Sequence, residues 1–199
     1  MLSELITWLV SIIGSLGYPG IVILMGLESS FFPFPSEVVV IPAGYLASQG
    51  EMNLGLVIIA GTFGSVLGAL FNYYLAVTLG RAVLLKHGRY FFIDEKKFAK
   101  VEKFLRDHGE FGTFIGRLIP VVRQYISFPA GLVRMNKARF TLFTAAGAML
   151  WMTVLALIGY VLGENEDLVA QASQEAIFWM LVFVAVASII YWKWKHMNR

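Results

Sequence analysis

Four charged side chains lie inside apolar stretches of this chain, where a charge is costly. Glu28 and Glu37 lie in an N-terminal stretch, and Arg117 and Arg123 lie in a second stretch further along. A charge at the bilayer centre costs at least about 2.5–3.5 kcal/mol on insertion scales. Guanidinium groups bind phosphate oxygens through paired N–H donors and stay charged at any relevant pH. A carboxylate in the same surroundings can gain or lose a proton. These residue types indicate a site for an anionic phosphate group.

The charge count suggests how such a site is controlled. With both glutamates ionised, the two arginines are neutralised and occupied. Protonation of Glu28 or Glu37 frees an arginine for phosphate, so proton binding and phosphate binding are linked and reciprocal. The alternative is that the four charges only hold two parts of the protein together. We favour the functional interpretation, because desolvation offsets much of the Coulomb attraction in a buried ion pair.

The composition is that of a membrane protein with several spans. The 199 residues are 58% hydrophobic and 15% charged, with a mean hydropathy of +0.70. An ordinary soluble domain is about 45–50% apolar and about 25% charged, so that class is excluded. A single membrane domain over 1–199 is expected at this length. The chain has no cysteine, which excludes disulfides and thiolate metal sites.

Three segments are long and apolar enough to cross a bilayer, which takes about 20 residues. They are 52–80, 140–163 and the shorter 176–192. Segments 20–49 and 111–131 are also apolar but contain prolines, which interrupt helical hydrogen bonding. These prolines are Pro33, Pro35, Pro42, Pro120 and Pro129.

Basic residues in short loops predict the orientation. The linker 81–110 and the cluster 134–139 are basic and are expected in the cytoplasm, together with the basic C-terminus. The acidic linker 164–175 is expected outside. Segment 111–131 lies between two cytoplasmic clusters, so it must enter the membrane and return as a re-entrant hairpin. Segment 20–49 is expected to do the same from outside.

The linker 81–110 is predicted to form an amphipathic surface helix. Asp94 is its expected N-cap, Leu105 lies on its apolar face, and Gly109 is its expected stop. Its basic face suits anionic lipid head groups, and a solvated connecting helix is an equally good interpretation.

An internal repeat organises the chain. Residues 33–44 align without gaps on 120–131, and after a loop shorter by four residues 52–80 align on 135–163. Each half is a Pro-broken hairpin followed by a transmembrane helix, and the charge rule makes the two halves antiparallel. Such an inverted-topology repeat is typical of transporters, whose broken segments meet near the midplane. The predicted halves are 17–80 and 111–163, and 176–192 is an additional C-terminal transmembrane helix. The expected fold is therefore all-α and polytopic.

No enzyme motif accompanies this pattern. His87, His108 and His196 lie in predicted cytoplasmic segments, and no nucleophile has a base at a recognisable spacing. No phosphate-binding P-loop, metal motif or basic–aromatic array is present. We therefore expect no catalytic residues, cofactor, metal or nucleic-acid partner.

Four blocks of sequence resemble the signature blocks of the DedA family, the bacterial branch of membrane proteins that share the VTT, or SNARE-associated, domain. They are the ESSFFPFPSE run at 28–37, the glycine-containing span at 64–81, the FIGRLIPVVR run at 114–123 and the PAG run at 129–131. The resemblance covers about residues 17–163.

The resemblance implies two opposed re-entrant hairpins in the bacterial cytoplasmic membrane and lipid translocation, notably the return of undecaprenyl phosphate to the cytoplasmic leaflet. Residues matching Glu28, Glu37, Arg117 and Arg123 are the family's functional positions. One departure is Ala69, where many members carry an aspartate, so a role for that aspartate cannot be transferred.

Together these observations predict a proton-coupled undecaprenyl phosphate flippase. Arg117 and Arg123 would hold the phosphate, and Glu28 and Glu37 would couple to protons. A phosphatidylethanolamine or general phospholipid flippase or scramblase, and a cation/proton antiporter, remain alternatives. Lipid identity, direction, H⁺ or Na⁺ coupling and assembly into a homo-oligomer stay open. The residues expected to shape the hairpins are Pro33, Pro35, Pro42, Pro120, Pro129 and Gly131.

Overall fold

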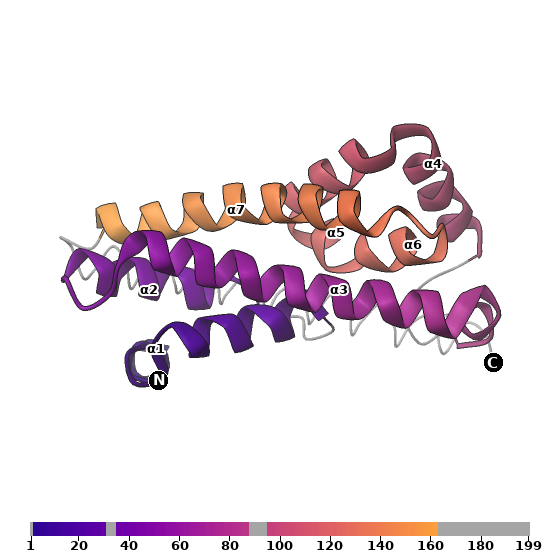
Figure 1. Cartoon of the computed structure of the whole chain (residues 1–199). Helices are drawn as coiled ribbons and strands as arrows, with labels where there is room; N and C mark the ends of the chain where they lie inside the picture. The colour runs from indigo at the N-terminus through magenta and orange to yellow at the C-terminus, as the bar shows by residue number, and fades with distance from the viewer. Residues whose placement is uncertain (1, 31–34, 88–94, 163–199) are drawn as a thin grey trace.

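A computed structural model of the chain describes residues 2–30, 35–87 and 95–162, and in these ranges it contains helices and no strand (Figure 1). This confirms the all-α prediction. The predicted span 176–192, the linker residues 88–94 and Pro33 lie outside the described residues. The helices are α1 (Leu2–Ser30), α2 (Glu37–Ser48), α3 (Leu54–His87), α4 (Glu95–Leu118), α5 (Pro120–Tyr125), α6 (Ser127–Leu132) and α7 (Lys137–Leu162).

Two of the described helices are long and apolar enough to cross a membrane. They are Leu54–Leu79 of α3 and Lys137–Leu162 of α7, each of 26 residues. At about 1.5 Å per residue each is about 39 Å long, more than the roughly 30 Å of a hydrocarbon core. They lie where the spans 52–80 and 140–163 were predicted. The chain runs in opposite directions along them, as the colours of Figure 1 show.

The outer surface of α3 is apolar. Its large exposed side chains recur every three or four residues and are between 43% and 58% exposed. A soluble monomer rarely shows so long an apolar stripe, whereas a lipid-facing helix needs one. The stripe consists of Leu56, Ile59, Phe63, Leu67, Phe71 and Tyr74.

α1 and α4 each bend at a glycine. Gly17 has φ 58° and ψ −147°, and Gly109 has φ 52° and ψ −132°. Positive φ is disfavoured for residues with a Cβ, so glycine permits both bends. The predicted stop at Gly109 is thus a change of direction, after which the helix resumes. Leu105, predicted on the apolar face of this helix, is buried.

The two proline-containing segments are broken in different ways. In the second, Ile119 is extended (φ −100°, ψ 115°), as a residue before proline prefers, and Pro120 starts α5. In the first, α2 runs through Pro42 without ending. Pro42 therefore removes one hydrogen bond there and does not break the helix.

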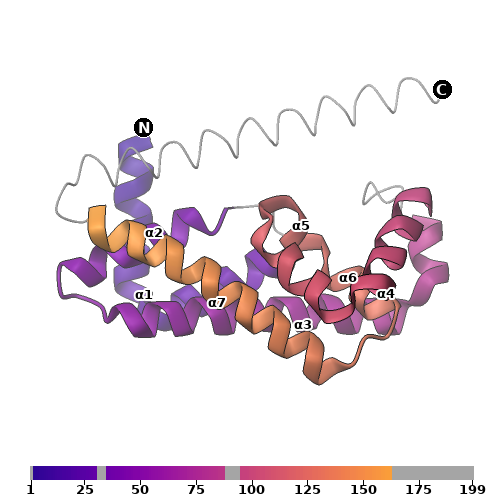
Figure 2. The same cartoon turned by 90° about the horizontal axis from the view of Figure 1, so that it is seen from above.

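The short helices α2 and α6 each pack on the long helix that lies further away in the sequence. α2 lies against α7 and α6 lies against α3, while α1 packs on α3 and α4 on α7 (Figures 1 and 2). Glycine makes the close crossings feasible. A Cβ on Gly44 would lie 2.3 Å from the carbonyl oxygen of Ala156, and a Cβ on Gly131 would lie 2.4 Å from that of Tyr73.

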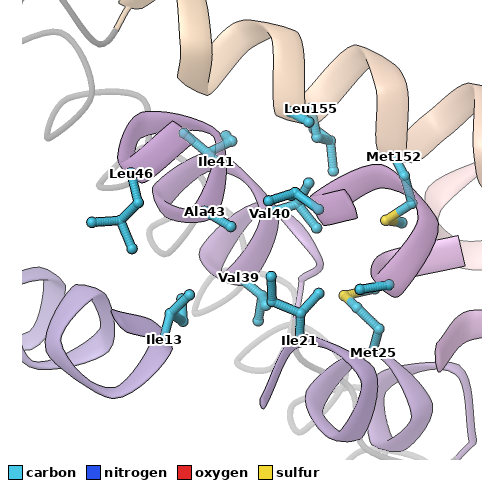
Figure 3. Packing of buried hydrophobic residues seen from close by; sticks show 13 residues of the cluster. Ile13, Ile21, Met25, Val39, Val40, Ile41, Ala43, Leu46, Met152 and Leu155 are labelled. Atoms are coloured by element: carbon cyan, nitrogen blue, oxygen red, sulfur yellow. The ribbon is translucent and has the colours of Figure 1, made fainter. Parts of the chain in front are cut away.

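An apolar cluster fixes α1 and α2 to α3 and α7. Its side chains point toward one another from α1, α2 and α7 in Figure 3. Burial of apolar surface contributes about 25 cal/mol per Å² against water, and in a membrane tight packing replaces that term. The labelled members are Ile13, Ile21, Met25, Val39, Val40, Ile41, Ala43, Leu46, Met152 and Leu155.

Candidate functional site

Glu28 and Arg123, two of the four predicted charges, form a buried ion pair. Arg123 Nη2 lies 2.5 Å from Glu28 Oε1, and the two side chains are 7% and 2% exposed. Glu28 lies in the last turn of α1, and Arg123 lies on α5. The pair therefore joins the first half of the chain to the second.

The hydroxyl of Ser36 hydrogen-bonds to three residues, which are Arg123 of α5, Trp151 of α7 and the neighbouring Glu37. Its Oγ accepts a hydrogen bond from Arg123 Nη2 at 2.8 Å and one from Trp151 Nε1 at 3.1 Å. Its hydroxyl donates to Glu37 Oε2 at 3.4 Å. A serine hydroxyl has two lone pairs and one proton, so these three contacts use all of its capacity. Glu37 is only half-buried and meets Arg123 through this hydroxyl.

Arg117 has a neutral partner. It lies in the last turn of α4, is 3% exposed, and donates from Nη2 to Ser127 Oγ at 2.6 Å. Within the ranges that the structure describes, the ion pairs are Glu28–Arg123 and the exposed Glu110–Arg139, so Arg117 contacts no carboxylate there. The charges of Glu28 and Arg123 nevertheless act on it electrostatically.

The buried charges are unbalanced. Among the residues whose burial the structure describes, the guanidiniums of Arg117 and Arg123 are buried with one carboxylate, that of Glu28. In addition, the Nε atoms of Arg117 and Arg123 are buried without a hydrogen-bond partner. Buried donors are normally satisfied, and an exception calls for an explanation such as a ligand or an ordered water. Unused donors on two adjacent cations suit a phosphate group, which is anionic and rich in acceptors.

Polar contacts hold Glu28 against α3. Ser29 Oγ donates to Glu28 Oε2 at 3.0 Å and lies 3.1 Å from Ser65 Oγ. Asn72 Nδ2 donates to the carbonyls of Ser29 and Ser30 at 3.2 and 2.5 Å. These are among the last carbonyls of α1, which have no partner within the helix. The end of α1, and with it Glu28, is therefore fixed by α3.

Sequence reasoning missed several members of this site. Ser36, Ser127 and Trp151 are not among the residues that the sequence predicts for the site. Tryptophans are common near the ends of membrane spans, where they form interfacial belts, and nothing distinguishes Trp151 from them by type. Ser36 carried a usable signal, because it adjoins Glu37. We call the following residues the arginine site: Glu28, Ser36, Glu37, Arg117, Arg123, Ser127 and Trp151.

Comparisons with known proteins agree with this architecture. The family model of the VTT domain matches residues 34–161. The uncharacterized membrane protein YkoX of Bacillus subtilis is 36% identical over 82% of this chain and 72% of its own length. The undecaprenyl phosphate transporter A of Bacillus subtilis is 34% identical, covering 84% of this chain and 80% of its own. An alkaline phosphatase-like protein of Lactococcus lactis subsp. cremoris is 31% identical over 92% of this chain and 86% of its own length. No solved structure matches.

The fold, the apolar helices and these matches define a helical membrane protein. The chain belongs to the VTT-domain family, also called the DedA family. The resemblance drawn from its four sequence blocks is thereby confirmed.

Proposed function

We propose that this protein carries a lipid phosphate across the bacterial cytoplasmic membrane, with undecaprenyl phosphate as the first candidate and protons as the coupled ion. The observation that carries the proposal is the unbalanced arginine site, in which two described guanidiniums are buried with one carboxylate, which pairs with Arg123 alone. The names of relatives from Bacillus subtilis and Staphylococcus aureus, undecaprenyl phosphate transporter A, support the choice of lipid. They also favour a transporter over an enzyme.

Matching contacts support two inverted halves. The repeat pairs Gly44 with Gly131 and, in the long helices, Tyr73 with Ala156. Gly44 lies against the Ala156 carbonyl and Gly131 against the Tyr73 carbonyl, so one crossing recurs at equivalent positions of the two halves. With α3 and α7 running in opposite directions, this is the packing expected of two re-entrant hairpins that exchange partners.

The proposed cycle begins with Arg123 bound to Glu28. Protonation of Glu28 removes its charge and weakens the ion pair, so the guanidinium becomes available to phosphate oxygens. Arg117 needs no protonation step before it binds phosphate, because its partner Ser127 is neutral. A phosphate oxygen can replace the Ser127 hydroxyl as the acceptor. When the phosphate leaves, Glu28 loses its proton and pairs with Arg123 again. Glu37 acts on Arg123 through the Ser36 hydroxyl.

The lipid tail needs no polar path in this scheme. The apolar stripe of α3 allows a polyprenyl chain to stay in the hydrocarbon while the head group crosses between the halves. The prolines flanking the arginine site, including Pro35 and Pro129, would shape the hairpins around the head group. Irregular backbone is tolerated at membrane depth only inside protein or next to water.

One observation favours phosphatidylethanolamine as a second candidate. Glu37 is half-buried, and its described hydrogen bond, from Ser36 at 3.4 Å, is long. Its carboxylate is therefore available to an ammonium group while the arginines take the phosphate. Competition between the two lipids in one transport assay separates these candidates.

Head-group exposure in proteoliposomes tests the proposal. Undecaprenyl phosphate in sealed vesicles is attacked by an added membrane-impermeant phosphatase, and the rate at which the inner-leaflet pool becomes accessible is measured. We expect wild-type protein to expose this pool and Arg123→Ala to abolish its exposure. A pH gradient with the acidic side inside the vesicles should change the rate of exposure by wild-type protein. Exposure no faster than in protein-free vesicles, or an Arg123→Ala rate equal to wild type, would contradict lipid-phosphate transport.

Arg139→Ala is the matched control. Arg139 is 69% exposed and donates to Glu110 at 2.9 Å. This hydrogen bond lowers the pKa of Glu110, so its carboxyl group is ionised at neutral pH. The substitution removes the same charge as Arg123→Ala but from a solvated pair, which contributes little. Its transport rate should equal that of wild type.

A further inference from the structure

Trp151 holds Arg123 in a way that does not depend on Glu28. The Arg123 guanidinium carbon lies 5.4 Å from the centre of the Trp151 ring, within the range of a cation–π contact. The indole N–H of Trp151 is anchored to Ser36 Oγ at 3.1 Å. The ring face is therefore fixed by α2 and presented to a cation on α5.

The proposed transport cycle creates a need for such a contact. When Glu28 is protonated, Arg123 loses the only carboxylate that it contacts among the described residues. A buried charge left without a partner is strongly disfavoured. The guanidinium would then turn toward water or toward whichever acceptor is nearest, and the phosphate site would be lost. The Ser36 hydroxyl would remain as a partner of Arg123, but it is neutral, and its two lone pairs already accept hydrogen bonds from Arg123 and Trp151.

We infer that Trp151 is a positioning residue that keeps the Arg123 guanidinium in place, with its N–H edge free for phosphate, while Glu28 is protonated. This inference rests on the proposed function. An aromatic face satisfies a cation electrostatically without occupying any of its N–H donors. The ring thus leaves Nε, and the donor released when Glu28 is protonated, for phosphate oxygens, which a second carboxylate would not do.

The indole suits this position better than another aromatic group. It combines the strongest cation–π face with an N–H donor, and here the donor anchors the face to Ser36. Trp151→Phe keeps a ring but loses the anchor, and Trp151→Leu loses both. We expect the transport rate to fall in that order, from wild type through Trp151→Phe to Trp151→Leu.

A series of fluorinated tryptophans placed at position 151 alone, by nonsense suppression, separates the ring face from its shape. Added fluorine withdraws electrons from the face and weakens the cation–π contact, while the shape of the ring changes little and its N–H donor to Ser36 is retained. We expect the rate of lipid-phosphate exposure to fall stepwise from one to four fluorines, by roughly tenfold overall, as the strength of a desolvated cation–π contact implies. A purely structural role would give a flat series, which would overturn the inference.

A second measurement works without transport. In Glu28→Gln, which mimics the protonated glutamate, the ring becomes a main partner of Arg123. The apparent unfolding temperature in detergent should therefore fall more steeply along the fluorine series than it does with Glu28 present. Equal slopes would overturn the inference even if wild-type protein transports lipid. If wild-type protein transports nothing, the proposed function fails, and this comparison still decides whether Trp151 holds Arg123.

Tyr74→Leu is the control for losing a cation–π contact as such. Lys137 Nζ lies 5.0 Å from the Tyr74 ring, and both residues are exposed. Leucine keeps the lipid-facing stripe of α3 apolar, so this substitution should leave the rate of lipid-phosphate exposure unchanged. A loss as large as that of Trp151→Leu would show that the assay responds to any lost aromatic residue and would overturn the assignment to Trp151.

Discussion

At the scale of single residues, the two buried arginines are chemically alike but differently bound. Arg123 has a carboxylate, a hydroxyl and an indole face as partners, whereas Arg117 has one hydroxyl. Arg117 is therefore the less neutralised cation and the one with fewer contacts to give up. In the proposed cycle Arg117 attracts the phosphate first, and Arg123 joins when Glu28 is protonated.

Arg117→Lys tests whether transport needs the paired N–H donors of the guanidinium or only its positive charge. Lysine keeps the positive charge but offers a compact ammonium that cannot bind two phosphate oxygens in parallel. We expect the rate of lipid-phosphate exposure to fall at least about tenfold, because a charge-assisted hydrogen bond contributes about 1.5–3 kcal/mol. The unfolding temperature in detergent should change little.

Ser127→Ala is the companion variant. It removes the hydroxyl partner of Arg117 at 2.6 Å and leaves the guanidinium intact. The free energy of unfolding should fall by about 1–3 kcal/mol, because a buried donor loses its acceptor. Transport should stay within a few-fold of wild type. Wild-type transport by Arg117→Lys would contradict bidentate phosphate binding at this position.

The charged members of the site were predictable because charge is expensive in an apolar stretch. Glu28, Arg117 and Arg123 stand out for that reason alone, and all three are buried close together. Ser36 and Trp151 were not predictable in the same way. Serine and tryptophan are ordinary in membrane segments. The roles of Ser36 and Trp151 are therefore seen only in the folded protein, where the start of α2 meets α5 and α7.

At the scale of the helices, composition predicted the long elements well and the short ones poorly. The spans in α3 and α7 follow from runs of apolar residues, which have one stable outcome in lipid. The bends do not follow so directly. A glycine such as Gly109 permits a stop or a change of direction, and packing decides between them. Pro42 was likewise expected to break a helix that neighbouring contacts keep intact.

Gly159→Ala tests the close crossing of α2 on α7. A Cβ at position 159 would lie 2.1 Å from the carbonyl oxygen of Ile41, and backbone cannot move aside easily. We expect the free energy of unfolding to fall by about 1–3 kcal/mol or more, the usual cost of overpacking. The thermal unfolding midpoint in detergent measures the effect.

Gly14→Ala is the matched control for this substitution. The nearest atom to its new Cβ would be Leu46 Cδ1 at 4.0 Å, which is an ordinary contact. Because alanine has the higher helix propensity, by up to about 1 kcal/mol, the control should unfold at the same or a higher temperature. If the two variants unfold together, the crossing is looser than the glycine contacts indicate.

At the scale of the whole molecule, the proposed transport cycle requires two halves that enter the membrane from opposite sides. The charge rule predicts that the loop between α2 and α3 lies outside and the loop between α6 and α7 lies inside. These loops are equivalent in the predicted repeat, so inversion requires that they be exposed on opposite sides of the membrane.

Cysteine labelling can decide this, because the chain has no cysteine of its own. Glu51 and Asn136 are exposed in the two loops. A membrane-impermeant maleimide added to intact cells should label Glu51→Cys and spare Asn136→Cys, and permeabilised cells should label both. Labelling of both positions in intact cells would place the loops on one side. The predicted inversion would then be wrong, and the Glu28–Arg123 pair would join two segments that enter the membrane from the same side.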